Sequence, residues 1–277
     1  MDLAVLALIT LVASTVNGAL GYGFSSITVP VALIFFTNRI LNPALVLVEL
    51  VINGYVLFIN RKSIPTIWWR VAPILIGLAV GVAIGSYILS LVHPAWVKFV
   101  TYIVLLPLIL LQAAGIRKPI QAEKTLAIPF GVSIGTLYSV TTISGPPLAV
   151  LFNNQGYAKQ DFRAALGVIR VAEGIFTGIA YYFIGLYSYE SIAIIPYIIP
   201  SVLLGIPLGS YLIRLMDHET FRRICMAFDA VIVTFGLSRV LTELNLATPL
   251  ITYSIFTIVM ILNAYLLFRF FRDKTVP

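Results

Sequence analysis

The hydrophobic pattern of the chain consists of long apolar segments joined by short polar loops, and two of these segments are broken inside. Residues 17–30 read NGALGYGFSSITVP, and residues 134–147 read IGTLYSVTTISGPP. Glycine, serine, threonine and proline disfavour a continuous helix, and an unwound backbone inside a membrane is tolerated only where protein or a water-filled cavity surrounds it. We therefore predict two broken helices, the first with short arms over residues 3–16 and 27–36.

The two broken segments belong to an internal repeat that covers most of the chain. Two offsets describe it, one of about 117 residues through the broken segments and one of about 124 residues after a longer link. The aligned pairs include Gly18 with Gly135, Pro30 with Pro147, Glu49 with Glu173, Gly81 with Gly205, and Gly85 with Gly209. The glycine pairs form small-xxx-small motifs, which let membrane helices pack closely. Paired Gly/Pro-interrupted segments in two halves of a chain point to the binding site of a transporter.

The repeat and the remaining apolar runs give the predicted organisation of the chain. We predict a first repeat over residues 1–118, a second over residues 119–242, and an unmatched helix with a basic tail over residues 243–277. The apolar runs predict membrane crossings near residues 42–59, 71–92, 97–114, 163–186, 190–213, 221–241 and 246–268. A polar loop is predicted from residue 61 to residue 70, because it carries Arg61, Lys62 and Arg70.

The composition identifies the class of protein. Hydrophobic residues make up 60% and charged residues 10% of the chain, against roughly 45–50% and 25% in an ordinary soluble domain. With a mean hydropathy of +1.02, the chain reads as an integral membrane protein of transmembrane helices. Cys225 is the single cysteine, which excludes disulfides and cysteine-rich metal sites. The net charge of +7 is explained by the positive-inside bias of membrane proteins and predicts no nucleic-acid partner.

The distribution of basic residues predicts the orientation. If each broken segment is a re-entrant hairpin, each half makes three crossings and the repeats are inverted, which leaves only Arg39, Lys98 and Arg239 of the 18 lysines and arginines outside. If each broken segment crosses once, the repeats are parallel and the basic residues divide far more evenly. The positive-inside rule favours the inverted arrangement. We therefore predict an all-α integral membrane protein in the inner (plasma) membrane, with the N-terminus outside and the C-terminus in the cytoplasm.

The tips of the two hairpins are the first candidate site. Half-helices that meet near the midplane from opposite faces direct unsatisfied N–H groups and positive dipole ends into one cavity, which suits an anion. The candidate substrate-binding residues at the tips are Ser25, Ser26, Thr141, Thr142, Ser144 and Gly145. The alternative for the hydroxyl groups is that they satisfy the broken backbone.

A polar stripe on the predicted sixth segment, residues 163–186, is the second candidate. Arg170, Glu173, Thr177 and Tyr181 fall on one helical face, and Glu173 lies about 15 Å deep when counted from residue 163. Charged residues at this depth are costly and functional by default. We predict that Arg170 and Thr177 bind substrate, because Arg170 aligns with a valine in the other repeat. The alternative for Arg170 is a structural ion pair with Glu173 or Asp229.

Three acids are candidates for proton coupling. Glu49 and Glu173 are related by the repeat, and Asp229 lies in the predicted eighth segment, where it aligns with a leucine. Symmetry-matched acids suit either architecture or proton handling, and Asp229 suits either a structural partner of Arg170 or a proton relay. The sequence contains no nucleophile triad, metal-ligand cluster or phosphate-binding loop, so no cofactor or metal is predicted.

The chain resembles the TauE/SafE family of membrane permeases over nearly its whole length. The resemblance rests on the glycine-rich break that runs into Val29-Pro30, on its repeat ending Pro146-Pro147-Leu148, and on the small-residue helices that follow each. Where family members often have G-x-G-G-G, this chain has Gly21-Tyr22-Gly23-Phe24-Ser25. The family is associated with export of sulfite, sulfoacetate and related sulfur-containing anions across the bacterial inner membrane, and the resemblance implies that substrate class here.

The sequence therefore predicts a secondary carrier rather than an enzyme. The predicted partners are a small anionic substrate such as sulfite or an organosulfonate, the lipid bilayer, and protons or another coupling ion. The alternative is an anion-selective channel, which needs a continuous wetted path and no coupling ion. The sequence leaves the oligomeric state open.

Overall fold

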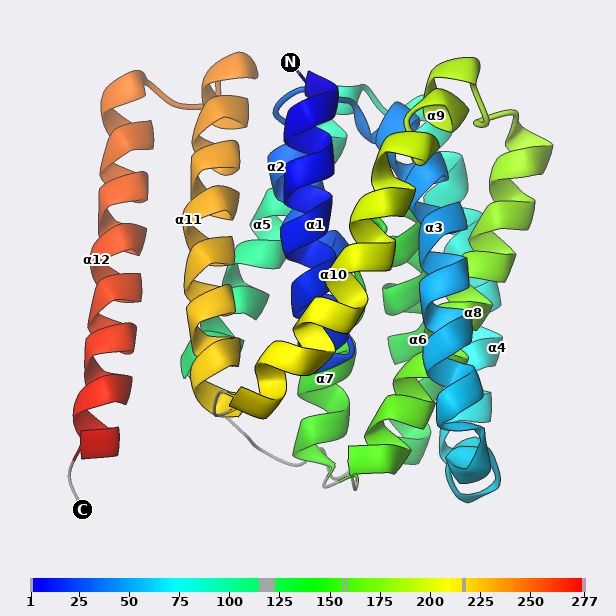
Figure 1. The fold of residues 1–277 in the computed structure, drawn as a ribbon. Helices are drawn as coiled ribbons and strands as arrows, with labels where there is room; N and C mark the ends of the chain where they lie inside the picture. The colour runs from blue at the N-terminus through cyan, green and yellow to red at the C-terminus, as the bar shows by residue number, and fades with distance from the viewer. Residues whose placement is uncertain (1, 115–122, 156, 158, 216–217, 276–277) are drawn as a thin grey trace.

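The computed structural model describes residues 2–114, 123–155, 157, 159–215 and 218–275, and every regular element in these ranges is helical (Figure 1). The helices of the first half are α1 (Asp2–Leu20), α2 (Phe24–Ala32), α3 (Asn38–Ile59), η1 (Arg61–Ser63), α4 (Ile64–Leu91) and α5 (Pro94–Ala114). Those of the remainder are α6 (Glu123–Thr141), α7 (Gly145–Asn154), α8 (Lys159–Ile184), α9 (Tyr189–Ala193), α10 (Ile195–Leu215), α11 (His218–Glu243) and α12 (Pro249–Thr275). The repeat boundary predicted at residue 118 lies outside the described residues.

The helices form one bundle, in which α1 with α2 and α6 with α7 form two helical hairpins. In Figure 1, α1 starts at the end of the bundle that holds the N-terminus, and α2 returns toward that end. The pair α6 and α7 opens toward the opposite end, where the C-terminus lies. The long helices α3, α4, α8, α10, α11 and α12 run between the two ends.

Helix length and composition identify an all-α membrane protein. Among the described residues, six helices are long and apolar enough to cross a membrane, namely Leu3–Leu20, Asn38–Ile59, Arg61–Leu91, Gln160–Ile184, Tyr189–Leu212 and Pro249–Arg272. Five of these match predicted crossings. The predicted crossings at residues 97–114 and 221–241 fall within α5 (Pro94–Ala114) and α11 (His218–Glu243), whose side chains the structure describes only in part, and these two helices are not among the six.

Two predicted boundaries are wrong because helices continue through them. The predicted loop up to Arg70 is helical from Ile64 onward, since η1 takes up the turn in three residues. The first arm of the first hairpin does not end at residue 16 but runs to Leu20, which makes α1 long enough to be counted among the membrane-crossing helices. Both differences lengthen a helix at the expense of a loop.

The breaks themselves are shorter than predicted. Only residues 21–23 and 142–144 are non-helical. Ser139 and Thr141 lie within a continuous α6, where their hydroxyl groups donate to the carbonyl groups four residues earlier. Gly21 and Gly23 make the first break with φ angles of 84° and 111°, a left-handed conformation that glycine adopts without steric cost. Thr142 makes the second with a φ of 58°, which is strained for a β-branched residue.

Glycines let each hairpin pack tightly against a helix of the other half. A Cβ atom added at Gly81 of α4 would lie closer than 3.0 Å to the carbonyl oxygen of Val132 in α6, and one at Gly209 of α10 would meet the carbonyl oxygen of Thr15 in α1. Backbone approach at this range is possible only without side chains, which is the small-residue packing of membrane helices. The two hairpins are therefore each held by the partner half.

Replacing Gly81 by alanine is expected to destabilise the protein by about 1–3 kcal/mol, because the added methyl group overpacks the α4–α6 contact. Gly54 in α3 is the matched control, since an added Cβ there meets nothing within 4 Å and alanine favours the helix. Thermal melting of both variants in detergent measures the difference. Equal melting temperatures for Gly81→Ala and Gly54→Ala would contradict the close-packing explanation.

Candidate functional site

The tips of the two hairpins meet inside the bundle. The amino-terminal end of α7 begins at Gly145, where an added Cβ atom would lie 3.5 Å from the Cβ atom of Tyr22 at the tip of the first hairpin. The capping residues Gly23 and Ser144 make no side-chain cap hydrogen bond. The first N–H groups of a helix have no partner within the helix, so these uncapped ends favour negative charge.

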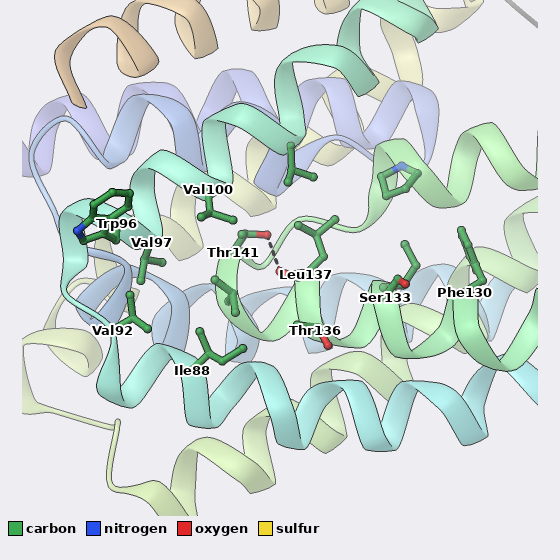
Figure 2. A pocket seen from close by; sticks show the side chains of 14 residues that line it. Ile88, Val92, Trp96, Val97, Val100, Phe130, Ser133, Thr136, Leu137 and Thr141 are labelled. Carbon is green, nitrogen blue, oxygen red and sulfur yellow. Dashed lines mark hydrogen bonds between the residues drawn. The ribbon is translucent and has the colours of Figure 1, made fainter. Parts of the chain in front are cut away.

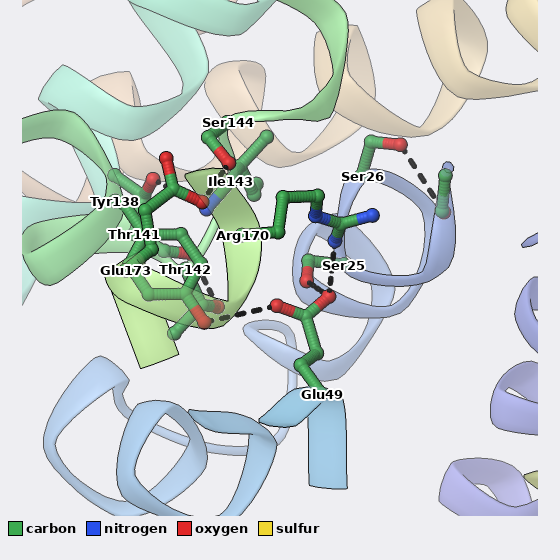
Figure 3. A network of polar contacts seen from close by, with 11 residues as sticks. Ser25, Ser26, Glu49, Tyr138, Thr141, Thr142, Ile143, Ser144, Arg170 and Glu173 are labelled. Carbon is green, nitrogen blue, oxygen red and sulfur yellow. Dashed lines mark hydrogen bonds and ion pairs between the residues drawn. The ribbon is translucent and has the colours of Figure 1, made fainter. Parts of the chain in front are cut away.

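Glu49 is the centre of a buried hydrogen-bond network beside the first tip. Its carboxylate accepts hydrogen bonds from Ser25 Oγ, from Arg170 Nη2 at 2.8 Å and from Tyr138 OH at 3.1 Å (Figure 3). The donors come from α2, α8 and α6, while Glu49 itself lies on α3 with 0% of its surface exposed. Four helices from both halves are thus tied together at one carboxylate.

Glu173 forms a second and sparser network at the other tip. Ser144 Oγ, immediately before α7, donates a 2.6 Å hydrogen bond to Glu173 Oε2 (Figure 3). The other carboxylate oxygen, Oε1, has no hydrogen-bond partner, and the residue is fully buried. Glu173 therefore has a free acceptor position in a place that water does not reach.

Arg170 is the cationic side chain of this cluster, and it is only partly satisfied. Its 2.8 Å ion pair is with Glu49, so the ion pair with Glu173 that we considered from their spacing does not form. The side chain is 2% exposed, and its Nε and Nη1 atoms have no hydrogen-bond partner. Buried donors without partners cost about 1–3 kcal/mol each, and this guanidinium has two nitrogen atoms available for a further acceptor.

The hydroxyl groups predicted at the tips divide into two kinds. Ser25 and Ser144 reach the two glutamates, as described above. Ser26 donates to the Gly23 carbonyl group, Thr141 to the Leu137 carbonyl group and Thr142 to the Thr141 carbonyl group. These three satisfy the backbone around the breaks, which is the alternative role that the sequence left open for them.

Thr177 lies one turn beyond Glu173 on the same face of α8. It is fully buried, and its Oγ1 atom has no hydrogen-bond partner. The last predicted member of the site, Asp229, falls within α11, but its side chain lies outside those that the structure describes. Its suggested pairing with Arg170 therefore stays a prediction.

Two buried tyrosines belong to the site although the candidate residues did not include them. Tyr138 binds Glu49, and Tyr181, on the predicted stripe of α8, donates to the Ser139 carbonyl group near the end of α6. A tyrosine hydroxyl buried in a membrane needs a partner, and this general rule is the one signal in the sequence that would have selected them. Asn42 caps the same end of α6 through a 2.6 Å hydrogen bond to the Val140 carbonyl group.

The first turns of α2 and α7 differ in the number of backbone N–H groups that they can donate to an anion. In α2, the first turn is Phe24, Ser25 and Ser26, which all carry backbone N–H groups. In α7, the first turn is Gly145, Pro146 and Pro147, and proline has no N–H group to donate. The first hairpin therefore supplies more backbone donors than the second.

A cavity of about 650 Å³ beside α6 is a poor place for a charged molecule (Figure 2). Its walls are apolar side chains of α4, α5, α6 and α7, with three hydroxyl groups. All three hydroxyls donate to backbone carbonyl groups: Ser133 to Pro129, Thr136 to Gly81, and Thr141 to Leu137. An anion there would find no charged side chain and only the indole N–H of Trp96 as a further side-chain donor. The better site is therefore the polar cluster at the tips, which consists of Ser25, Glu49, Tyr138, Ser144, Arg170, Glu173 and Thr177.

The sequence model of the family described as sulfite exporter TauE/SafE matches residues 6–235, which include both hairpins and every residue of the polar cluster. No curated protein and no solved structure matches the chain.

Proposed function

Because the chain belongs to the sulfite exporter TauE/SafE family, a family of membrane transporters, we propose that it is a secondary transporter of sulfite or a small organosulfonate. The observation that carries the proposal is the state of Arg170, which is buried at the meeting point of the hairpin tips with two nitrogen atoms unpartnered. An oxyanion supplies the acceptors that these donors lack. Charge-assisted hydrogen bonds of this kind are about twice as strong as neutral ones.

The substrate position follows from the donors around Arg170. The uncapped start of α2 adds backbone N–H groups on one side, and the start of α7 at Gly145 lies on the other. The hydroxyl hydrogens of Ser25 and Ser144 are donated to Glu49 and Glu173, so these serines hold the two carboxylates beside the anion. Thr177 adds a buried hydroxyl group without a partner. We propose that the anion is bound among these groups, with Ser26, Thr141 and Thr142 holding the backbone of the tips in shape.

Burial supports a carrier over a channel. Glu49 and Glu173 are 0% exposed and Arg170 is 2% exposed, so the polar cluster is sealed from solvent in this conformation. A channel needs a continuous wetted path, whereas a carrier passes through a closed state as it alternates its access. Transport driven by an ion gradient, measured in proteoliposomes, would distinguish the two.

The direct test is binding by the purified protein. Sulfite, sulfoacetate, isethionate and taurine are added separately, with chloride and nitrate as control anions, and the melting temperature is recorded. A ligand that binds the folded protein at 100 times its Kd stabilises it by about 2.7 kcal/mol, which gives a clear shift. If no sulfur-containing anion shifts melting more than chloride does, the proposed substrate class is wrong.

The architecture we propose is two inverted repeats, residues 1–118 and 119–242, followed by an extra helix at 243–277. The opposite directions of the α1–α2 and α6–α7 hairpins support it, as does the reciprocal glycine packing of each hairpin on the other half (Figure 1). We also propose that the N-terminus faces the outside of the inner membrane and the C-terminus the cytoplasm, from the positive-inside rule.

Cysteine labelling is expected to separate inverted from parallel repeats. Single cysteines at Arg61, Gln160 and Asn245, introduced after Cys225→Ser, lie in the loop after α3, at the start of α8 and between α11 and α12. Inverted repeats predict that positions 61 and 160 label from the cytoplasmic side and position 245 from the outside. Parallel repeats predict that 61 and 245 label together and 160 from the other side, and this result would rule our architecture out.

A further inference from the structure

A second cavity lies away from the proposed transport site, between α11 and α12. It measures about 490 Å³ and is lined by residues at the end of α11 and the start of α12. These two helices lie side by side at the edge of the bundle, and α12 buries only 17% of its apolar window inside the protein (Figure 1). The cavity therefore borders the lipid bilayer rather than the protein interior.

The lining changes from aromatic to polar along the cavity. Phe235 lies about 12 Å below the end of α11, and Phe256 lies at a similar distance below the start of α12. Arg239, Thr242 and Glu243 line the outer part, in the last turns of α11. Since α11 is about 39 Å long and the hydrocarbon about 30 Å thick, these last turns reach the level of the lipid headgroups.

The polar part of the cavity contains groups that lack partners. Ser238 is 7% exposed and lines the cavity, and its Oγ atom has no hydrogen-bond partner. Arg239 is exposed and forms no ion pair among the residues that the structure describes. Lys98 of α5 is close enough to interact electrostatically with both Arg239 and Glu243. Two cations and one acid leave a local excess of positive charge at headgroup level.

From this arrangement we propose that the cavity binds an anionic membrane phospholipid. Its phosphodiester group is bound by Arg239 and Ser238, and an acyl chain lies against Phe235 and Phe256. A water-soluble anion would satisfy Arg239 but leave the aromatic part of the cavity without an apolar occupant. The lipid contacts both helices and so fixes α12, which has no counterpart in the repeat and lies beyond the family match at residues 6–235.

The test uses the full-length protein purified in detergent and depleted of lipid. Phosphatidylglycerol is added in mixed micelles, and bound lipid is counted by native mass spectrometry while melting is followed in parallel. We expect the wild type to retain the lipid and to melt at a higher temperature with it. Loss of one charge-assisted contact in Arg239→Gln is expected to weaken lipid binding about tenfold or more.

Two further variants keep the result interpretable. Ser238→Ala removes only the unpartnered hydroxyl group and is expected to weaken lipid binding without changing melting in lipid-free detergent. Arg61→Gln removes an exposed arginine at the other end of the bundle and is expected to bind the lipid like the wild type. Equal lipid retention by wild type, Arg239→Gln and Ser238→Ala overturns the proposal. Stabilisation by inorganic phosphate as strong as that by the lipid overturns it as well.

Discussion

Replacing Arg170 by lysine is expected to give a folded protein that binds its anion about 30-fold or more weakly than the wild type. Lysine keeps the positive charge that faces Glu49, so the buried carboxylate stays paired. It does not keep the planar guanidinium, whose several N–H groups serve Glu49 and leave Nε and Nη1 for a ligand. Losing a charge-assisted contact in a buried site costs about 2–5 kcal/mol of binding free energy.

Calorimetric titration measures the affinity, and melting without ligand measures the stability. Arg39→Lys is the matched control, because the Arg39 guanidinium donates hydrogen bonds to the carbonyl groups of Leu89, Ser90 and Val92 and touches no part of the polar cluster. It is expected to lose stability and to keep its affinity. An Arg170→Lys protein that binds like the wild type removes Arg170 from the substrate site.

Arg170→Ala is expected to behave differently from the lysine variant. Removing one partner of a buried ion pair leaves the other charge uncompensated, at a cost of about 3–5 kcal/mol. Since Glu49 is fully buried, the alanine variant should lose stability even without ligand. Comparing Arg170→Lys with Arg170→Ala therefore separates the contribution of Arg170 to stability from its contribution to anion affinity.

Local spacing predicted which residues of α8 are buried but not what they contact. Arg170, Glu173, Thr177 and Tyr181 recur at helical spacing, and all four are buried, as an inward-facing stripe requires. The same spacing made Glu173 one of two candidate partners of Arg170, beside Asp229, yet the observed ion pair is with Glu49, 121 residues away in the chain. Pairing across helices depends on how the bundle packs, and one sequence does not reveal that.

The two helix breaks also show how far the sequence alone predicts the structure. Glycine, serine, threonine and proline predict where the breaks lie but overestimate their length, because serine and threonine can also lie within a helix with their hydroxyl groups bonded to its own carbonyl groups. Thr141 does this in the last turn of α6, and Thr142 then bears the strained φ angle that ends the helix. Composition predicts the region in which a helix breaks, whereas the residue at which the helix ends is known only from the structure.

The charges of the polar cluster indicate that the anion binds together with a second ion, a proton. Among its described residues, the cluster contains one cation, Arg170, and two carboxylates, Glu49 and Glu173, so it carries no spare positive charge when both carboxylates are ionised. A bound anion would add another negative charge in a region closed to water, which is unfavourable unless one carboxylate is neutralised. Three donors already point at Glu49, whereas Oε1 of Glu173 has no partner. We therefore propose that Glu173 takes up the proton that accompanies the anion.

Glu173→Gln is accordingly expected to abolish accumulation driven by a pH gradient while permitting exchange of substrate across the membrane. Glutamine mimics the protonated side chain and keeps an oxygen for the Ser144 hydrogen bond. With one coupled proton, a gradient of one pH unit supports at most about tenfold accumulation, and in the variant this ratio should fall to about one. Proteoliposomes with radiolabelled substrate measure both activities, and Glu190→Gln, which changes an exposed acid of α9, is the control. If Glu173→Gln still accumulates substrate in response to the pH gradient, Glu173 has a structural role and another group carries the coupling ion.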